Sequence, residues 1–244
     1  MDTAPLNALS PSPLAPRESL ALEPTDWRIL APAERGRVGR AAGLAAKRAL
    51  DVVGASTCLV LLAPWLLAVA VWIRYDSAGP VLFRQRRLGR NGRPFWILKF
   101  RTMRVDAEAG LHALEARNEA SQGVLFKMKD DPRVTRIGHA LRRTNVDELP
   151  QLWNVLRGEM SLVGPRPFQL RDSERLEGLD AHAFARRLEF SPGLTGAWQV
   201  GRSSSTDSER LLEFDLDYID QWSLGLDLRL IYRTFFIVLR GFLS

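Results

Sequence analysis

The longest apolar segment of the chain is Val52–Ile73, which has 22 residues without a charged side chain between Asp51 and Arg74. A helix of about 18 to 20 apolar residues can cross a bilayer, so this pattern predicts a membrane helix rather than an ordinary buried helix. Pro64 lies near the middle of the segment and removes one helix hydrogen-bond donor. Two interpretations fit: a span with a kink, or a helix–break–helix that dips into one leaflet and returns.

A β-hairpin is predicted after this segment. Two strand-like apolar runs, Val81–Phe83 and Phe95–Leu98, flank the turn-forming residues Gly89–Gly92. Apolar runs of this kind on either side of a glycine-containing turn are typical of two antiparallel strands.

Basic residues dominate the predicted hairpin. The range Arg84–Arg104 holds eight Lys and Arg side chains and no acid, and beside a membrane segment they would attract lipid headgroups by about 1 kcal/mol each. Basic residues also precede the apolar segment, which fits a re-entrant helix with both ends in the cytoplasm, while a kinked span stays open. Lys99 and Arg101 alternate around Phe100, so we expect them to project from one face of the strand.

A second amphipathic pattern begins at the carboxylate pair Asp147–Glu148. Pro150 is acceptable only in the first turn of a helix, which places the start of this helix at about Asp147. Just upstream, Ile137 and Leu141 predict a short helix that also carries Arg142. The apolar face of the second helix consists of Leu149, Leu152, Trp153 and Leu156, at the spacing i, i+3, i+4, i+7.

The C-terminal range Leu226–Phe242 also has helical periodicity. Its arginines fall on one stripe, and apolar side chains occupy much of the remaining circumference. This arrangement is typical of a helix lying in a membrane interface, and equally of a core helix with one solvated side. The stripe consists of Arg229, Arg233 and Arg240.

Composition narrows the chemistry. The chain has 244 residues, and its hydrophobic fraction of 46% is too high for a mostly disordered protein. Cys58 is the single cysteine, which excludes an intramolecular disulfide and a Cys-rich zinc site. Only three histidines are present, far apart in sequence, which argues against a His-based metal site. The formal net charge of +6 indicates an anionic partner. Familiar signatures of nucleotide hydrolases, serine hydrolases, zinc proteases and DNA-reading modules are absent.

The strongest candidate site is Asp147–Glu148 with the cations around it. Taken alone, two acids in the first turn of a helix complement its dipole and cap its free N–H groups. Arg142 lies just upstream, however, and Arg166 is held between Pro165 and Pro167, which restrict its backbone. A stiffly held guanidinium is a good phosphate clamp. A carboxylate pair among such cations could hold a divalent ion on a phosphorylated substrate, or could attack phosphorus.

The range Ser191–Arg202 is a second candidate site. It is rich in glycine, contains Trp198 and ends in an arginine. Such a loop could receive a nucleobase and phosphates, but the same residues are typical of a structural turn. Without further context we prefer the structural interpretation.

With these motifs assembled, the chain resembles the bacterial sugar transferases that load a polyprenyl-phosphate carrier, the monotopic phosphoglycosyl transferases. The resemblance covers about Lys47 to Phe242 and rests on motifs that stand in the family's order. They are KRALDVV, the apolar segment, GPVLFRQRRLGRNGRPFWILKFRTM, DPRVTRIGHALRRTNVDELPQLWNVLRGEMSLVGPRP, SPGLTGAWQV and the C-terminal YI–WSL–LDLRLI region.

The resemblance implies an α+β, helix-rich fold with a membrane-embedded re-entrant helix–break–helix, a small basic β-hairpin and amphipathic interfacial helices. It decides between the two interpretations of the apolar segment and matches the break to Pro64. We therefore expect a disordered Ala/Pro-rich tail at 1–40, a re-entrant membrane anchor at 41–76 and a catalytic domain at 77–244. The expected location is the bacterial inner (cytoplasmic) membrane, with the active site on the cytosolic face.

The resemblance also implies the chemistry. Asp147 would attack the β-phosphate of a UDP-sugar, release UMP and carry a phosphosugar that polyprenyl phosphate then removes. Glu148, together with Asp147, would coordinate Mg²⁺. The exopolysaccharide-like form of the motifs favours UDP-glucose or UDP-galactose as donor and undecaprenyl phosphate as acceptor. The expected substrate- and phosphate-binding residues are Lys99, Arg101, Arg142, Arg166, Arg202 and Asp215.

The expected partners are thus a UDP-sugar, undecaprenyl phosphate and membrane lipid, and no nucleic acid. A homo-oligomer and downstream glycosyltransferases are further partners that we leave open. Two other functions also stay open. One is a membrane-bound, Mg²⁺-dependent phosphohydrolase that uses the same carboxylates, and the other is a non-catalytic basic membrane scaffold for polysaccharide enzymes.

Overall fold

The computed structural model describes residues 37–107, 128, 130–201 and 208–243. Most of these residues are helical, and the strands form two small sheets of two strands each. The predicted α+β, helix-rich class is therefore confirmed. In chain order the elements are α1 (Arg37–Asp76), β1 (Leu82–Leu88), the 3₁₀ turn η2 (Arg90–Gly92), β2 (Pro94–Phe100), α3 (Arg136–Thr144), the 3₁₀ turn η4 (Val146–Glu148), α4 (Gln151–Arg157), β3 (Ser161–Val163), α5 (Leu170–Leu179), α6 (Ala181–Arg187), β4 (Gly193–Thr195), α7 (Ala197–Gly201), α8 (Ser208–Asp220) and α9 (Leu224–Leu243).

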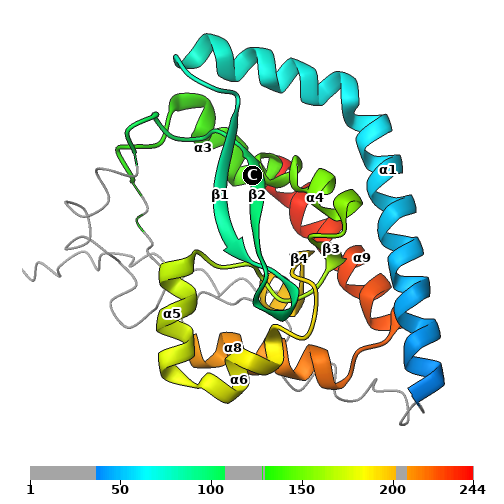
Figure 1. Cartoon of the computed structure of the whole chain (residues 1–244). Coiled ribbons are helices and arrows are strands. Elements are labelled where there is room, and N and C mark those ends of the chain that lie inside the picture. The colour runs from blue at the N-terminus through cyan, green and yellow to red at the C-terminus, as the bar shows by residue number, and fades with distance from the viewer. Residues whose placement is uncertain (1–36, 108–127, 129, 202–207, 244) are drawn as a thin grey trace, which may run out of the picture.

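The predicted membrane segment lies within α1, a helix of 40 residues. By length and composition, Ala41–Asp76 is apolar enough to cross a membrane, and 11% of its most apolar window is buried inside the protein. The helix bends in Figure 1, but it continues through Pro64 without interruption. The predicted helix–break–helix is therefore one bent helix, because proline kinks a helix whose neighbouring turns remain bonded. The re-entrant path through the membrane stays a prediction.

Charged side chains near the start of α1 fasten it to the rest of the fold. Lys47 is buried and donates to the Val163 carbonyl at 2.9 Å and to the Asp227 carboxylate of α9 at 2.8 Å. Arg48 donates to two carbonyls at the end of α4, at 2.6 and 2.8 Å. Because α4 begins beside the candidate carboxylates, these bonds fix the apolar helix relative to that site.

Strands β1 and β2 form the predicted antiparallel hairpin. Its tip is a 3₁₀ turn in which Asn91 has a φ of 56°, a left-handed conformation that asparagine tolerates. Phe95 and Ile97 are buried against α4, whereas Trp96 between them is exposed. The alternation along β2 thus packs one face of the hairpin and leaves the other open.

The middle of the chain differs from the prediction in one respect. Helix α3 occupies the range predicted around Leu141, but the carboxylate pair lies on η4, and α4 begins only at Gln151. The sequence had predicted a single helix from about Asp147. Pro150 explains the difference, because its missing N–H cannot join an α-helical ladder and regular bonding starts after it.

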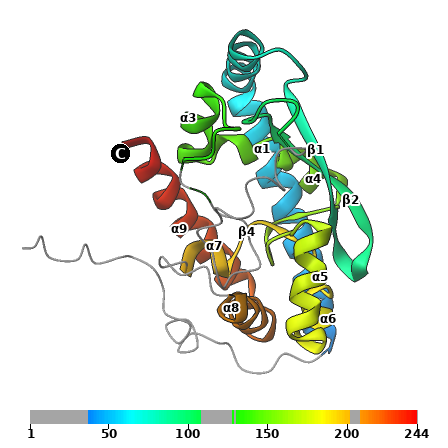
Figure 2. The ribbon, with the colours of Figure 1, turned by 90° about the vertical axis from the view of Figure 1, so that its left-hand side faces the viewer.

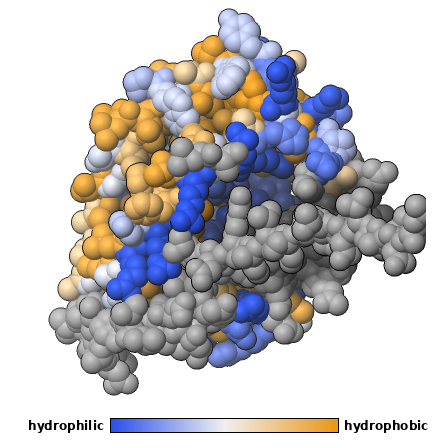
Figure 3. All heavy atoms as spheres, turned by 180° about the vertical axis from the view of Figure 1, so that it is seen from behind, coloured by the Kyte–Doolittle hydropathy of each residue, from blue (hydrophilic) through white to orange (hydrophobic). Residues whose placement is uncertain are grey.

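The C-terminal helix α9 combines the two predicted arrangements. Leu226 and Leu230 are buried in the core, whereas Phe235 and Phe242 near its end are exposed. The ring centroid of Phe242 lies 6.4 Å from that of Trp65, one residue beyond the proline of α1. Seen from behind, apolar residues gather on the side of the molecule along which α1 runs (Figure 3).

The largest hydrophobic core lies between α5, α6, α7, α8 and α9. Figures 1 and 2 show α5, α6 and α8 together at the end of the molecule that is remote from the C-terminal arm of α1. The core fixes these helices relative to one another, and they in turn hold the segment after β3 in place. One buried side chain from each helix illustrates it: Leu176, Phe184, Trp198, Tyr218 and Leu230.

Candidate active site

Asp147 and Glu148 lie on η4, between α3 and α4. Asn145 ends α3 with a φ of 56°, and this left-handed residue lets the chain turn directly into η4. The Asp147 residue is only 9% exposed. Two adjacent carboxylates are therefore held on a short, ordered turn below the surface.

Two cations from distant parts of the chain bind the Glu148 carboxylate. Lys99 of β2 places its Nζ 2.7 Å from Oε1, and Nη2 of Arg166, in the loop after β3, lies 3.0 Å from the same oxygen. The side chains of Glu148 and Lys99 are 17% and 18% exposed, so this contact is largely shielded from water. The fold thus brings Lys99, Glu148 and Arg166 together, as predicted, with Asp147 beside them.

The two neighbouring carboxylates have opposite pKa shifts. Burial raises the pKa of Asp147 to about 6, and the charge of Glu148 adds to this effect while Lys99 opposes it. Burial acts on Glu148 in the same direction, but Arg166 and Lys99 outweigh it and hold the pKa of Glu148 well below its usual range. Neighbouring acids whose pKa values are shifted apart are typical of active sites in which the two acids have different roles.

Arg142 faces these carboxylates from α3. Its Nε donates to the hydroxyl of Thr102 at 2.8 Å, which fixes the guanidinium plane. Burial lowers the pKa of Arg142, while the charges of Asp147 and Asp131 act in the opposite direction. Arg142 in turn lowers the pKa of Asp147, so this predicted residue also belongs to the site.

These side chains line one cavity with a volume of about 1160 Å³. Ligand pockets are usually about 300–1,000 Å³, so the cavity has room for more than one substrate. It lies between the hairpin, the α3–α4 region and the loop after β3. Its lining includes Lys99, Arg142, Asp147, Glu148 and Arg166.

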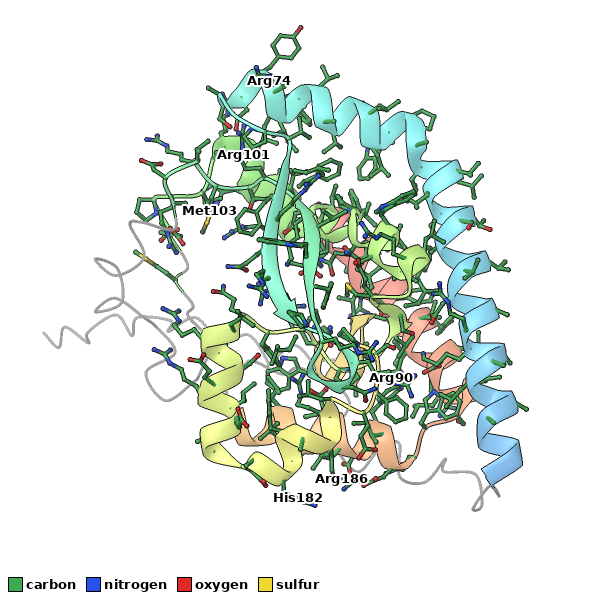
Figure 4. The ribbon with its side chains drawn as sticks, in the orientation of Figure 1. Arg74, Arg90, Arg101, Met103, His182 and Arg186 are labelled. Atoms are coloured by element: carbon green, nitrogen blue, oxygen red, sulfur yellow. The ribbon has the colours of Figure 1, made fainter. Side chains whose placement is uncertain are left out.

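Arg101 lines the same cavity but does not join the carboxylates. Its guanidinium donates to the carbonyl oxygens of Ser77 and Ala78 at 2.6 and 2.9 Å, just after α1. Figure 4 shows it near Arg74 at the end of that helix. Lys99 and Arg101 thus line the same cavity, as expected, but only Lys99 bonds to the carboxylate of Glu148. A phosphate-binding role for Arg101 stays a prediction.

Asp215 lies outside the cavity lining, on α8, where it is 1% exposed. Its Oδ2 accepts two bonds from Arg187, at 3.0 and 2.9 Å. Burial raises the pKa of Asp215, and Arg187 opposes this rise. The expected direct contact between Asp215 and substrate is therefore corrected to a position behind the site. The predicted contact through Arg202 lies outside the described residues.

The segment from Ser191 onward, the second candidate, supports the loop that carries Arg166. Gly164 N donates to the Thr195 carbonyl and Gly193 N donates to the Pro165 carbonyl, both at 2.9 Å. A Cβ on Gly164 would lie 2.3 Å from the Ser191 carbonyl oxygen, so only glycine permits this approach. The structural interpretation of this segment therefore fits its position.

Comparison with known proteins places this geometry in a family. The family described as bacterial sugar transferase matches residues 42–241. The chain belongs to this family. Galactosyl transferase CpsE of Streptococcus agalactiae serotype III is 44% identical over 199 residues, which are 81% of this chain and 43% of CpsE.

Two further relatives of this chain differ in length. The UDP-glucose:undecaprenyl-phosphate glucose-1-phosphate transferase of Escherichia coli K12 is 39% identical over 203 residues, 81% of this chain and 40% of that protein. The exopolysaccharide production protein ExoY of Rhizobium meliloti is 39% identical over 206 residues, 83% of this chain and 89% of ExoY. The chain thus spans about two fifths of the longer relatives.

The candidate metal ligands of the site are two adjacent carboxylates. Within the part of the chain that the structure describes, no group of three or more His, Cys, Asp or Glu side chains could hold a metal ion. Mg²⁺ on a phosphorylated substrate needs only one or two protein carboxylates, because phosphate oxygens and water complete its octahedron. Asp147 and Glu148 fit that requirement, although Lys99 and Arg166 already share one oxygen of Glu148.

Arg187 could not be singled out from the sequence. The side chain of Arg187 is 4% exposed, whereas that of its neighbour Arg186 is 34% exposed. Two successive arginines in a polar stretch carry no pattern that separates the buried one from the exposed one. The available signal was weak: Phe184 lies one helical turn before Arg187 and marks the buried face of α6.

Proposed function

We propose that this chain transfers a sugar-1-phosphate from a UDP-sugar to undecaprenyl phosphate and so starts the assembly of an exopolysaccharide or related glycan. The observation that carries the proposal is that the pKa of Asp147 is raised and that of Glu148 is lowered, in a cavity lined by cations. The relatives' names support the substrate classes. They include a UDP-galactose-lipid carrier transferase of Erwinia amylovora and the glucose-1-phosphate transferase from Escherichia coli.

In the first step an oxygen of the Asp147 carboxylate attacks the β-phosphorus of the UDP-sugar. A new phosphorus–oxygen bond forms, the bond to the bridging oxygen breaks, and its electron pair leaves with UMP. The sugar phosphate stays on Asp147 as an acyl phosphate. A pKa of about 6 leaves this carboxylate ionised at neutral pH, and burial limits its hydration, which favours attack.

In the second step a phosphate oxygen of undecaprenyl phosphate attacks the same phosphorus. The bond to Asp147 breaks, the carboxylate is restored, and the product is an undecaprenyl diphosphosugar. Both steps bring several negative oxygens into the cavity, where Lys99, Arg142 and Arg166 offset their charge.

Asp147 and Glu148 would hold Mg²⁺, which when bound neutralises part of the diphosphate charge. Glu148 stays ionised at every working pH, because Arg166 and Lys99 hold its pKa low. Glu148 therefore holds Lys99 and Arg166 next to Asp147 even before a substrate binds. Mg²⁺ and the role of Asp147 are tested by the experiment below.

The proposed location is the cytosolic face of the inner membrane. A lipid carrier requires a membrane site, and a soluble nucleotide-sugar requires access from the cytosol. A cavity close to the membrane is supported by its lining, which includes Pro80–Phe83, a few residues beyond the end of the apolar helix α1.

The decisive experiment traps the covalent adduct. The purified full chain in nanodiscs is incubated with UDP-[¹⁴C]glucose or UDP-[¹⁴C]galactose and MgCl₂, without lipid acceptor, and is then quenched. We expect UMP release of about one equivalent and a labelled peptide that contains Asp147. Undecaprenyl phosphate, added next, should move the label into lipid, and EDTA should suppress both reactions.

Asp147→Asn should abolish UMP release, whereas Asp106→Asn serves as control because Asp106 is exposed and lies outside the carboxylate pair. Full UMP release by Asp147→Asn would refute the covalent mechanism. Release of free sugar phosphate without transfer to lipid would instead favour the phosphohydrolase.

The anchor is tested by labelling. In a Cys58→Ala background, Ala42→Cys and Ala78→Cys introduce thiols at exposed positions on either side of the apolar segment. A re-entrant helix predicts that an impermeant maleimide reacts with both thiols from the cytosolic side. Labelling of the two thiols from opposite sides would establish a span instead.

A further inference from the structure

We infer that the buried ion pair Arg187–Asp215 positions Arg166, the phosphate clamp of the proposed function on which this inference rests. Nη2 of Arg187 donates to the backbone carbonyl oxygen of Arg166 at 2.7 Å. Nε and Nη2 of the same side chain donate to Oδ2 of Asp215, at 3.0 and 2.9 Å. One guanidinium thus ties the backbone of the clamp to helix α8.

The pair is enclosed on all sides. The side chains of Arg187 and Asp215 are 4% and 1% exposed. The guanidinium carbon of Arg187 also lies 4.9 Å from the ring centroid of Phe168 and 5.9 Å from that of Phe184. The planar guanidinium of Arg187 is held in one orientation by the two aromatic rings and by the carboxylate of Asp215. Its hydrogen bond to the Arg166 carbonyl therefore has a fixed direction.

A buried ion pair is a poor source of stability, because the cost of removing both charges from water offsets their attraction. Apolar residues of similar size would fill the same space at least as well. What apolar residues cannot supply is a donor directed at the Arg166 carbonyl. The structure therefore assigns to the Arg187–Asp215 pair the role of positioning Arg166.

Arg166 has little freedom once its backbone is held. The carbonyl of the residue before it accepts a bond from Gly193 N at 2.9 Å, and its own carbonyl accepts from Arg187. From this fixed peptide its side chain reaches Oε1 of Glu148 at 3.0 Å. The charge of Arg166 lowers the pKa of Glu148 and, to a smaller extent, that of Asp147.

The test removes both charges at once, so that neither remains buried and unpaired. The double variant Arg187→Met with Asp215→Val keeps the space filled with apolar side chains. The matched control is Arg186→Met with Asp220→Val, an ion pair that joins the same two helices but is partly exposed. Figure 4 shows Arg186 at the lower end of the molecule, beside His182. Arg166→Ala gives the full effect of losing the clamp.

With UDP-glucose or UDP-galactose and undecaprenyl phosphate, we expect the Arg187/Asp215 double variant to fold but to lose at least about tenfold in kcat/KM. Loss of a directly contacting donor typically costs about 10²–10³-fold, so a displaced one should cost less. The loss should fall mainly on kcat of the folded protein, as in Arg166→Ala, because the clamp offsets charge that develops during the reaction. A purely structural role would lower the free energy of unfolding and leave kcat of the folded protein unchanged. The control pair should match the wild type.

A folded double variant with wild-type kcat and KM would overturn the inference. If the double variant does not fold, Asp215→Asn decides in the same way, because it keeps the shape of the side chain and one acceptor oxygen for Arg187. It leaves the charge of Arg187 without a carboxylate, so its free energy of unfolding is measured alongside kcat and KM. Absence of UMP release by the wild type would refute the proposed function instead. An active wild type, an impaired Arg166→Ala and an unimpaired Asp215→Asn would refute the positioning role alone.

Discussion

The ionised carboxylate of Asp147 should destabilise the folded protein, so that Asp147→Asn is predicted to stabilise it while removing activity. The residue is 9% exposed, and burial is the largest cause of its raised pKa. Asparagine has nearly the same shape but no charge, so the substitution removes the cost of burying the ion. Loss of stability in exchange for reactivity is common at active sites.

The magnitude follows from the pKa of Asp147. It rises from its ordinary value of 3.8 to about 6, and one pH unit corresponds to about 1.4 kcal/mol, so the ion costs up to about 3 kcal/mol. Because the folded-state pKa is the higher one, the folded protein binds the extra proton between pH 3.8 and about 6. The wild type therefore loses this stability as the pH rises through that window. The advantage of Asp147→Asn should be complete at pH 8 and small near pH 4.

The assay is urea unfolding in detergent micelles at pH 8 and at pH 4.5, followed by tryptophan fluorescence. Asp106→Asn, at an exposed position, should change the free energy of unfolding by less than about 0.5 kcal/mol at either pH. UMP release is measured on the same samples and should be lost only in Asp147→Asn. The reasoning is refuted if Asp147→Asn is no more stable than the wild type at pH 8, or if its gain is equal at both pH values.

Three further predictions use other parts of the structure. Glu148→Gln removes a charge that raises the pKa of Asp147, so the acid limb of kcat/KM against pH should move to lower pH while kcat falls at least tenfold. Lys47→Met leaves the carboxylate of Asp227 buried without its cation, which should cost about 3–5 kcal/mol in the free energy of unfolding, measured in urea. Arg101→Met removes the donors to two carbonyls after α1 and should cost about 1–3 kcal/mol, with KM for the UDP-sugar changed less than threefold. A much larger rise in KM would show that Arg101 does bind phosphate.

Features encoded by neighbouring residues could be predicted from the sequence. The hairpin follows from two apolar runs around a turn, and α3 and α9 follow from helical periodicity. Asp147 and Glu148 were identifiable because the prolines around Arg166 and the nearby arginines gave an unusual density of charge on restrained backbone. Their roles came from the resemblance to a family, since first-turn acids alone are equally typical of helix caps.

Features set by contacts between distant residues could not be predicted. Lys99 and Arg101 both line the cavity, but no local pattern shows that Lys99 bonds to Glu148 whereas Arg101 bonds to the carbonyls after α1. Asp215 stands 28 residues beyond Arg187, and no local pattern indicates that the two meet in the core. A proline inside an apolar run signals a lost hydrogen bond, yet whether the helix bends or ends there depends on what packs against it. Each of these outcomes is decided by tertiary packing.

The two adjacent carboxylates of the site have different tasks: Glu148 binds the cations, and Asp147 keeps a raised pKa. Glu148 receives direct bonds from Lys99 and Arg166, so its charge is compensated at the expense of its basicity. Asp147 is buried and is repelled by the charge of Glu148, and both effects raise its pKa. A carboxylate with a higher pKa is the better nucleophile towards phosphorus. If both cations were bonded to Asp147 instead, they would lower its pKa and weaken its attack. Placing them on the neighbouring residue keeps them within reach of an incoming diphosphate, whose oxygens can replace Glu148 as their partners. The order of the two acids along the chain therefore matters as much as their presence, because only the residue that the cations do not contact directly retains the reactivity that the proposed first step needs.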